Sequence, residues 1–317
     1  MPRPRAGKAV RRELMALLAL PGSGRALRLM DDCGLLTALF PELEPSRRCA
    51  LEYYGPGGVL AHTFAALDRA DLMFRRLPLV FPGVAGSVAE QLASCRGGAE
   101  RRRALLRLAV LFHDVAKPST ARRIKGRLRF FGHDAKGAQA ASAIMKRLRF
   151  SREETATVAA VIAHHLRPGN LAAAGLVTDR AARRFFRDTG EHAVSLLLVA
   201  WADHASYLPE DRLLELLPLA KGGLADEEFQ APPGLAEDAA KTLRHLWTIS
   251  VLLARRFRRP VRPLERLIDG NDVMRVLGLE PGPEVGKILG KVARARALGR
   301  LASRSQALAL IERFRPE

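Results

Sequence analysis

Apolar residues along this chain recur with the spacing of helices, and the alternation typical of strands is nearly absent. Leucine, alanine, arginine and glutamate dominate most segments, and these residues favour helices. The sequence therefore predicts an all-α fold. The one exception is residues 121–131 (ARRIKGRLRFF), where Lys125-Gly126 would turn two short basic arms into a β-hairpin.

Two segments are almost continuously apolar, which is typical of a buried helix. The first, residues 105–112 (LLRLAVLF), ends at His113-Asp114. The second, residues 195–202 (SLLLVAWA), is followed directly by Asp203. Burying an imidazole or a carboxylate is costly unless it is hydrogen-bonded or binds a metal, so both helix ends are candidate sites. The structural alternatives are a core histidine bonded to its neighbour, and a carboxylate that caps a helix or pairs with an arginine.

A third helix is predicted to begin at the capping box Ser151–Glu154 and to end at His164-His165. Adjacent helical residues point about 100° apart, so the sequence does not decide which histidine of this pair binds a ligand. Together with two further histidines, these helix ends supply nitrogen and oxygen donors that suit divalent first-row ions, as in a metal-dependent phosphohydrolase. The candidate metal ligands are His62, His113, Asp114, His133, His164, His165 and Asp203.

With 317 residues, the chain is long enough for one large or two ordinary domains. We expect an N-terminal helical segment at residues 1–50 and a domain at residues 51–215 that holds every candidate ligand. Paired glycines and prolines predict a linker at residues 216–234. A helical, basic C-terminal segment is expected at residues 235–317.

The composition limits the expected cellular location and the class of binding partner. No run of eighteen apolar residues occurs, and Cys33, Cys49 and Cys95 have no paired spacing. We therefore expect no membrane span, reduced thiols and a cytoplasmic location. Lys and Arg number 52 against 33 Asp and Glu, and the net charge of +19 favours a nucleic acid as partner. A coding bias toward GC produces the same arginine excess without selection for binding.

Basic residues also suggest where an acidic partner would bind. Lys117 is placed to neutralise charge on phosphoryl oxygens, and its alternative role is that of a solvated lysine at a helix end. Arg167, beside the histidine pair, is a second candidate for binding substrate phosphate. Candidate RNA-binding residues in the basic C-terminal stretches are Arg255, Arg256, Arg258, Lys291, Arg294 and Arg296. The alternative for most basic stretches is a solvated face.

Several motifs together resemble one family. His62-Thr63, residues 111–120 (LFHDVAKPST) and residues 131–138, which begin FGHD, resemble HD-domain phosphohydrolases. More narrowly, they resemble the HD-bearing C-terminal part of bacterial CCA-adding tRNA nucleotidyltransferases. Residues 25–42 and 264–289 resemble the flanking segments of these enzymes, so the resemblance covers about residues 10 to 314.

The resemblance implies a helical HD core around divalent ions, two in number and drawn from Mg, Mn, Ni, Fe or Co. It implies His62, His113, Asp114 and Asp203 around one metal. His133 and the histidine pair resemble second-metal ligands, with Asp114 bridging, and Asp114 and Lys117 are the implied catalytic residues. The implied activity is hydrolysis of nucleotide or RNA phosphoesters, of the 2′,3′-cyclic phosphate or 2′-nucleotide type.

One departure from the family limits this expectation. The Gly-Gly or Gly-Ser turn and the Asp-x-Asp pair of the nucleotidyl-transfer head are not found, and no room for that head precedes Arg25. We therefore expect no nucleotide addition by this chain alone. Two alternatives remain: a tRNA-binding protein that partners a separately encoded head, and a phosphodiesterase of signalling nucleotides.

Overall fold

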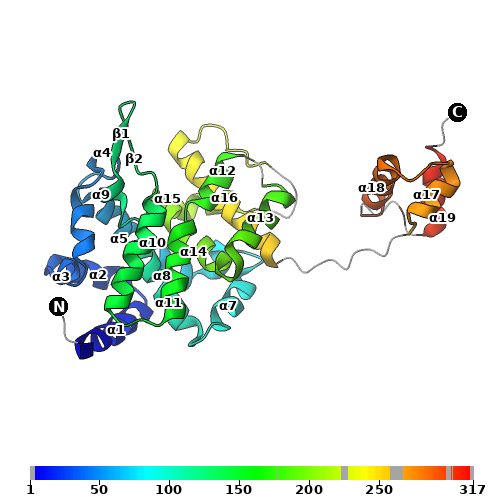
Figure 1. Cartoon of the computed structure of the whole chain (residues 1–317). Helices are drawn as coiled ribbons and strands as arrows, with labels where there is room; N and C mark the ends of the chain where they lie inside the picture. Colours follow the sequence, from blue (N-terminus) through cyan, green and yellow to red (C-terminus); the bar gives the residue numbers. More distant parts are fainter. Residues whose placement is uncertain are drawn as a thin grey trace. The chain divides into compact units, whose positions relative to one another are not determined.

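A computed structural model of the chain describes residues 4–175, 177–222, 228–257, 267–297, 301 and 303–314. Most of these residues are helical, and the described strands form one two-stranded hairpin, which confirms the predicted all-α class (Figure 1). The chain divides into two compact units, Met1–Phe257 and Arg258–Glu317. No described helix is both long and apolar enough to cross a membrane. All three cysteines are free.

The first unit contains most of the helices. In chain order they are α1 (Pro4–Ala19), α2 (Ser23–Asp32), α3 (Leu35–Leu39), η1 (Pro41–Arg48), α4 (Leu51–Tyr54), α5 (Gly58–Arg75), α6 (Leu77–Val80), α7 (Ala85–Ala93), α8 (Gly98–Phe112), α9 (Lys117–Thr120), α10 (His133–Arg147), α11 (Arg152–His164), α12 (Arg167–Ala173), α13 (Asp179–Thr189), η2 (Gly190–His192), α14 (Ala193–Ala205), α15 (Glu210–Leu216), η3 (Leu217–Ala220) and α16 (Glu237–Phe257). The capping box predicted at the start of α11 is present, since Ser151 and Glu154 bond each other's backbone amides.

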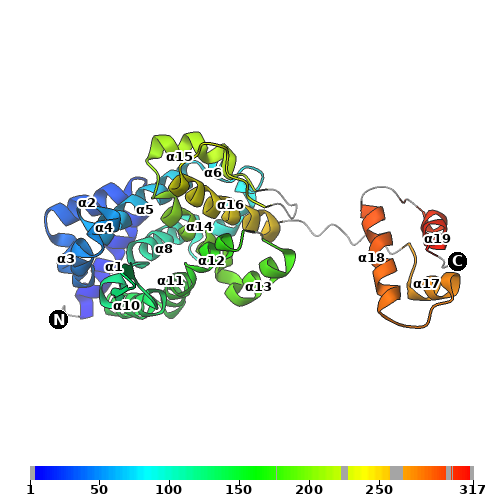
Figure 2. The same ribbon diagram turned by 90° about the horizontal axis from the view of Figure 1, so that it is seen from above.

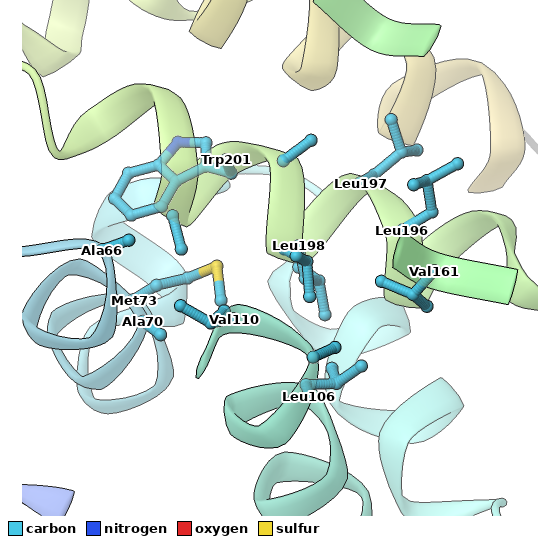
Figure 3. Close-up of a cluster of buried hydrophobic side chains, with 14 of the residues drawn as sticks. Ala66, Ala70, Met73, Leu106, Val110, Val161, Leu196, Leu197, Leu198 and Trp201 are labelled. Atoms are coloured by element: carbon cyan, nitrogen blue, oxygen red, sulfur yellow. The ribbon is translucent and has the colours of Figure 1, made fainter. Parts of the chain in front are cut away.

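Helices α5, α8 and α14 pack against one another in the interior of the first unit. Figure 3 shows Met73 of α5, Val110 of α8, and Leu198 and Trp201 of α14 meeting there. Each of these side chains is almost completely buried. Burying a large apolar side chain contributes roughly 1.5–3 kcal/mol, so this interior holds the three helices, and the polar residues at their ends, in fixed positions.

A buried ion pair joins α5 to α8. The Arg107 guanidinium lies 2.7 Å from the Asp71 carboxylate and donates a further bond to the Leu18 carbonyl at the end of α1. Asp71 also accepts bonds from the Ser23 hydroxyl and the Gly24 amide, both in α2. One charge pair therefore ties four helices together, and its hydrogen bonds offset the cost of burying it.

Removing Asp71 should destabilise the fold strongly. Asp71→Ala leaves Arg107 buried without its counter-charge, so the free energy of unfolding is expected to fall by about 3–5 kcal/mol. Asp68→Ala, one turn away on α5, breaks the half-exposed Arg28 pair and should cost about 1 kcal/mol or less. Denaturant unfolding of the two variants measures the difference, and equal losses would contradict the assigned role of the buried pair.

The predicted hairpin is confirmed. Strands β1 (Arg122–Ile124) and β2 (Arg127–Arg129) pair in antiparallel register. Lys125 and Gly126 at the turn both have positive φ, 49° and 75°. Two successive residues in the left-handed region match the turn type whose twist suits a two-residue hairpin.

The division into domains differs from the one drawn from the sequence. Helix α16, expected in the C-terminal segment, packs against α14 and buries Leu243 and Leu246 in the core of the first unit. The stretch expected as a linker also contributes to this core through Leu217, Ala220 and Phe229. Glycines and prolines made this stretch resemble a linker, but the apolar residues between them pack in the core. Composition alone therefore did not show that it belongs to the first unit.

The second unit is a small helical body with its own core (Figure 2). Its helices are α17 (Gly270–Leu277), α18 (Pro283–Ala297) and α19 (Arg304–Glu312). Val273, Ile288 and Ile311 lie at the centre of its apolar cluster. Asp272 is buried and accepts hydrogen bonds from Arg275 and Arg304, both at 2.6 Å, which joins α17 to α19.

Candidate metal centre

Helices α5, α8, α10, α11 and α14 bring six of the seven candidate ligands together. His62 lies in α5, His133 begins α10, and Asp203 lies in the last turn of α14. His113 and His165 cap the C-terminal ends of α8 and α11, and Asp114 follows His113. All six side chains are buried: His62, His113, Asp114, His133, His165 and Asp203. The interior packing of these helices thus gathers polar residues from distant parts of the sequence.

Three of the histidine rings are oriented by the backbone. In each, Nδ1 lies 2.7 Å from the carbonyl oxygen three residues earlier, and a carbonyl oxygen can only accept. Nδ1 therefore carries the proton and Nε2 keeps a free lone pair, which is the form that ligates metals. The pairs are His113 with Val110, His133 with Phe130, and His165 with Ile162.

His62 reaches the same state through a side chain. The Ser206 hydroxyl donates to the Asp203 carbonyl at 2.7 Å, so its oxygen accepts from His62 Nδ1 at 3.1 Å. Nε2 of His62 is then the free nitrogen as well. Nε2 of each of the four rings thus faces the site, and its lone pair is available to a metal whenever the ring is neutral.

The Asp114 carboxylate lies between two groups of these nitrogens. Its Oδ2 is 3.2 Å from His113 Nε2 and 3.6 Å from His62 Nε2. Its Oδ1 is 3.4 Å from His133 Nε2 and 3.9 Å from His165 Nε2. The ligand atoms within each group lie close enough together to hold one ion, so Asp114 belongs to two groups at once.

Asp203 completes the first group. Its Oδ1 lies 3.0 Å from His62 Nε2 and 3.6 Å from His113 Nε2. The first group therefore offers two imidazoles and two carboxylates, whereas the second offers two imidazoles and the shared carboxylate of Asp114.

The unpaired atoms of this site fit divalent cations. Nε2 of His62, His113 and His133 and Oδ1 of Asp114 are buried and have no hydrogen-bond partner. A lone pair that faces a carboxylate oxygen without a proton between them is repelled, and buried unpaired polar atoms are costly. Cations bound between these atoms would remove both penalties, and nitrogen with carboxylate oxygen suits first-row divalent metals.

The two buried carboxylates of the site also need a positive counter-charge. Burial opposes ionisation of Asp114 and Asp203, but the nearby His113, together with Lys117 at Asp114 and His62 at Asp203, holds the pKa of both carboxyls well below the usual range. Burial likewise opposes a charge on His113, yet the two carboxylates raise its pKa to about 10. A proton on His113 therefore balances the carboxylates unless a metal does. Burial lowers the pKa of His165 to about 4, which keeps that ligand neutral.

Lys117 is part of the site. Its Nζ donates to Asp114 Oδ2 at 2.5 Å and to the Tyr54 hydroxyl at 2.7 Å, and the side chain is buried. Burial opposes its charge, but Asp114 raises the pKa of Lys117 above its ordinary value. The alternative of a solvated lysine at a helix end therefore does not hold.

Two other candidates, His164 and Arg167, belong to neither ligand group. His164 is half-buried and belongs to neither ligand group; it lies close enough to His192 to contribute to the lowered pKa of that residue, which burial chiefly causes. Arg167 pairs with Asp188 at 3.0 Å. It lines a separate pocket of about 420 Å³ together with Arg180 and other residues of α12 and α13.

The candidate RNA-binding residues have mixed surroundings. The Arg255 side chain is almost buried and pairs with Asp179 at 2.9 Å, whereas Arg256 is exposed. In the second unit, Lys291 is exposed with its Nζ 4.6 Å from the centre of the Phe314 ring, and Arg296 is half-buried. Arg258 and the side chain of Arg294 lie outside the described residues.

Two tyrosines beside the candidate metal ligands were not predicted from the sequence. Tyr54 stacks on the His62 ring with centroids 4.7 Å apart, and Tyr207 lies 5.1 Å from the same ring. Ser206 and Tyr207 follow Asp203 by three and four residues, the spacing of one helix face, which is a usable signal. Tyr54 has no such relation to any ligand.

Comparisons with known proteins identify a family whose match includes the residues of this site. The HD domain family matches residues 59–208, a range that contains every member of both ligand groups. The chain is 31% identical to an A-adding tRNA nucleotidyltransferase of Deinococcus radiodurans and 30% identical to a CC-adding tRNA nucleotidyltransferase of Thermus thermophilus. These alignments cover 98% and 96% of this chain but 59% and 56% of the relatives. The chain thus spans little more than half the length of each.

Proposed function

The chain carries an HD domain and is homologous to tRNA nucleotidyltransferases over nearly its whole length, and from this we propose that it is a metal-dependent phosphohydrolase of nucleotide or RNA phosphoesters. One observation carries the proposal. A single buried carboxylate, Asp114, is shared by two groups of histidines whose Nε2 lone pairs have no partner. A protein that only bound RNA would gain nothing from burying this arrangement.

Two divalent ions at such a site supply an activated water and neutralise charge on the phosphate. The ions would be held by His62, His113, Asp114 and Asp203 on one side, and by Asp114, His133 and His165 on the other. The hydrogen bonds that each Nδ1 donates fix the rings before substrate binds, so the ligands need little reorganisation. In hydrolysis, a water oxygen bonds to phosphorus, the ester P–O bond breaks, and the leaving oxygen takes a proton.

Lys117 is the residue of this chain that we assign to the phosphate. Two of its three N–H donors are used by Asp114 and Tyr54, which leaves one for a phosphoryl oxygen. Its positive charge beside the shared carboxylate would stabilise the negative charge that builds on phosphorus oxygens in the transition state. Arg167 contacts substrate only if the substrate extends to its neighbouring pocket.

We assign an RNA-type substrate, a 2′,3′-cyclic phosphate or a 2′-nucleotide, for two reasons. The relatives are named for tRNA, and the chain carries a net charge of +19. Exposed basic residues of the second unit, such as Lys291, would add contacts to the RNA backbone. A signalling-nucleotide substrate is less favoured because the homology extends through the segments that flank the HD domain.

A substrate panel tests the proposal. The purified protein is stripped with EDTA, reloaded with Mg, Mn, Ni, Fe or Co in turn, and offered 2′,3′-cyclic AMP, 2′-AMP, 3′-AMP and a cyclic dinucleotide. We expect hydrolysis of 2′,3′-cyclic AMP or 2′-AMP that EDTA abolishes and one of the metals restores. A metal-loaded protein that cleaves none of the four would refute catalysis, and cleavage of the cyclic dinucleotide alone would favour the signalling alternative.

A further inference from the structure

Exposed aromatic rings gather beside the metal centre. In the part of the chain that the structure describes, the aromatic side chains that are largely exposed are Phe131 at 74%, Tyr53 at 53% and Tyr207 at 50%. Each of them lines a pocket that borders the metal ligands or the residues stacked on them. Exposing a large aromatic ring to water is unfavourable, so three at one site indicate a surface that a ligand covers.

The first pocket has a volume of about 570 Å³ and lies against the second ligand group. His133 forms part of its wall, and Tyr53, Leu128, Phe131 and Leu166 supply apolar surface. Flat apolar rings beside a phosphohydrolase centre suit a nucleobase, because any base can stack on an aromatic face.

The second pocket, of about 690 Å³, is lined by the two tyrosines that contact the His62 ring of the first ligand group. Tyr54 and Tyr207, which contact the His62 ring, form one wall, and Lys241 and His245 of α16 lie across from them. Tyr53 borders both pockets, so the two are neighbours. The first pocket therefore borders the second ligand group directly, whereas the second pocket is separated from the first group by Tyr54 and Tyr207. Each pocket lies in the size range of small-molecule sites.

The basic hairpin distinguishes the two pockets. It exposes Arg122, Arg123, Arg127 and Arg129 and contains no acidic residue, and the first pocket includes part of strand β2. The Tyr53 hydroxyl accepts a bond from the Leu128 amide at 3.2 Å, which holds the hairpin against α4. The second pocket has mixed charge, because it is lined by Lys241, by Asp238 and by Glu52, whose carboxylate pairs with Arg123 of the hairpin. The hairpin thus suits a phosphate backbone, whereas the second pocket suits a single nucleoside.

We propose that the site binds the 3′ end of a single-stranded RNA rather than a free mononucleotide. The terminal nucleoside occupies the second pocket, the penultimate base stacks on Phe131 and Tyr53, and the preceding backbone crosses the hairpin. Proteins recognise unpaired RNA in this way, through aromatic stacking beside a basic track. This inference rests on the proposed function and deepens it from a phosphoester to an RNA end.

Substrate length tests the inference. We expect kcat/KM for an RNA pentanucleotide ending in a 2′,3′-cyclic phosphate to exceed that for 2′,3′-cyclic AMP by about tenfold or more, the effect of at least one stacked base. Phe131→Ala should lower this ratio by about tenfold. The matched control, Leu20→Ala, removes an apolar side chain of similar exposure that lines neither pocket and should leave the ratio unchanged.

The charge of the hairpin is tested separately. Arg127→Glu should lower the ratio, and the loss should shrink as salt rises, because the contact is to backbone phosphate. Arg96→Glu, at an arginine whose side chain is 90% exposed outside both pockets, is the control. The inference would be overturned if Phe131→Ala and Arg127→Glu both kept the wild-type ratio of the two kcat/KM values. It would also be overturned if the wild-type protein cleaved the pentanucleotide no better than 2′,3′-cyclic AMP.

A binding measurement separates this inference from the proposed function. Fluorescence anisotropy with a labelled RNA pentanucleotide ending in a 3′-phosphate needs no hydrolysis. If Phe131→Ala weakens binding about tenfold while no phosphoester is cleaved, the RNA-end site stands and the phosphohydrolase proposal fails. If 2′,3′-cyclic AMP is cleaved but Phe131→Ala leaves pentanucleotide binding unchanged, the phosphohydrolase proposal stands and the RNA-end site fails.

Discussion

Replacing Asp114 by asparagine is expected to remove both metal ions and to lower hydrolysis about a thousandfold or more. Asparagine has nearly the same shape, but it carries no charge and can offer only its amide oxygen to a metal. Since Oδ1 faces one histidine pair and Oδ2 the other, a single substitution reaches both groups. Elemental analysis of the purified variant and its kcat/KM on 2′,3′-cyclic AMP measure the two effects.

The control for this variant is Asp134→Asn. Asp134 follows His133 in the first turn of α10 and belongs to neither ligand group, so its replacement should leave the metal content unchanged. Asp114→Asn also deprives the buried Lys117 of its counter-charge, so circular dichroism must establish that the variant folds. If the variant does not fold, the double variant His113→Gln/His133→Gln, which removes one histidine from each ligand group, replaces it. A folded variant that retains two ions and full activity would place the site elsewhere.

Replacing His133 by glutamine is expected to remove one metal ion per chain and leave the other. His133 contributes to the second group alone, through a nitrogen 3.4 Å from Asp114 Oδ1, whereas the first group keeps all its ligands. Hydrolysis should fall about a hundredfold or more, because one ion cannot act on both the attacking and the leaving oxygen. Elemental analysis across a metal titration follows the loss.

His62→Gln is the mirror variant, and it should remove the ion of the first group while sparing the second. The two variants together distinguish two sites from one site with excess ligands. Wild-type protein that never holds more than one ion per chain, even when metal is in excess, would rule out the two-metal arrangement.

The position of most candidate ligands could be predicted because each follows a strong local signal. Apolar runs marked the ends of α8 and α14, where His113, Asp114 and Asp203 lie, and a capping box marked the start of α11. The hairpin followed from Lys125-Gly126 between short basic arms. These patterns depend only on residues that are close in the sequence, so they can be recognised without knowledge of the tertiary packing.

What depended on tertiary contacts could not be predicted. His165, rather than His164, faces Asp114 because the end of α11 places its Nδ1 on the Ile162 carbonyl. Tyr54 reaches His62 only because α4 folds back beside α5. The domain boundary was misplaced for the same reason, since Phe229, in the expected linker, packs 6.0 Å from the Trp247 ring of α16.

The backbone bonds that orient three of the histidines also affect how the site tolerates mutation. A side-chain partner is lost when one residue is replaced, whereas a carbonyl oxygen is present whatever residue supplies it. Val110, Phe130 and Ile162 can therefore change identity without releasing the rings they hold, provided that the local backbone keeps its path. The direction of these ligands is encoded in the path of the backbone rather than in particular side chains, so only packing restricts which residues supply the carbonyls.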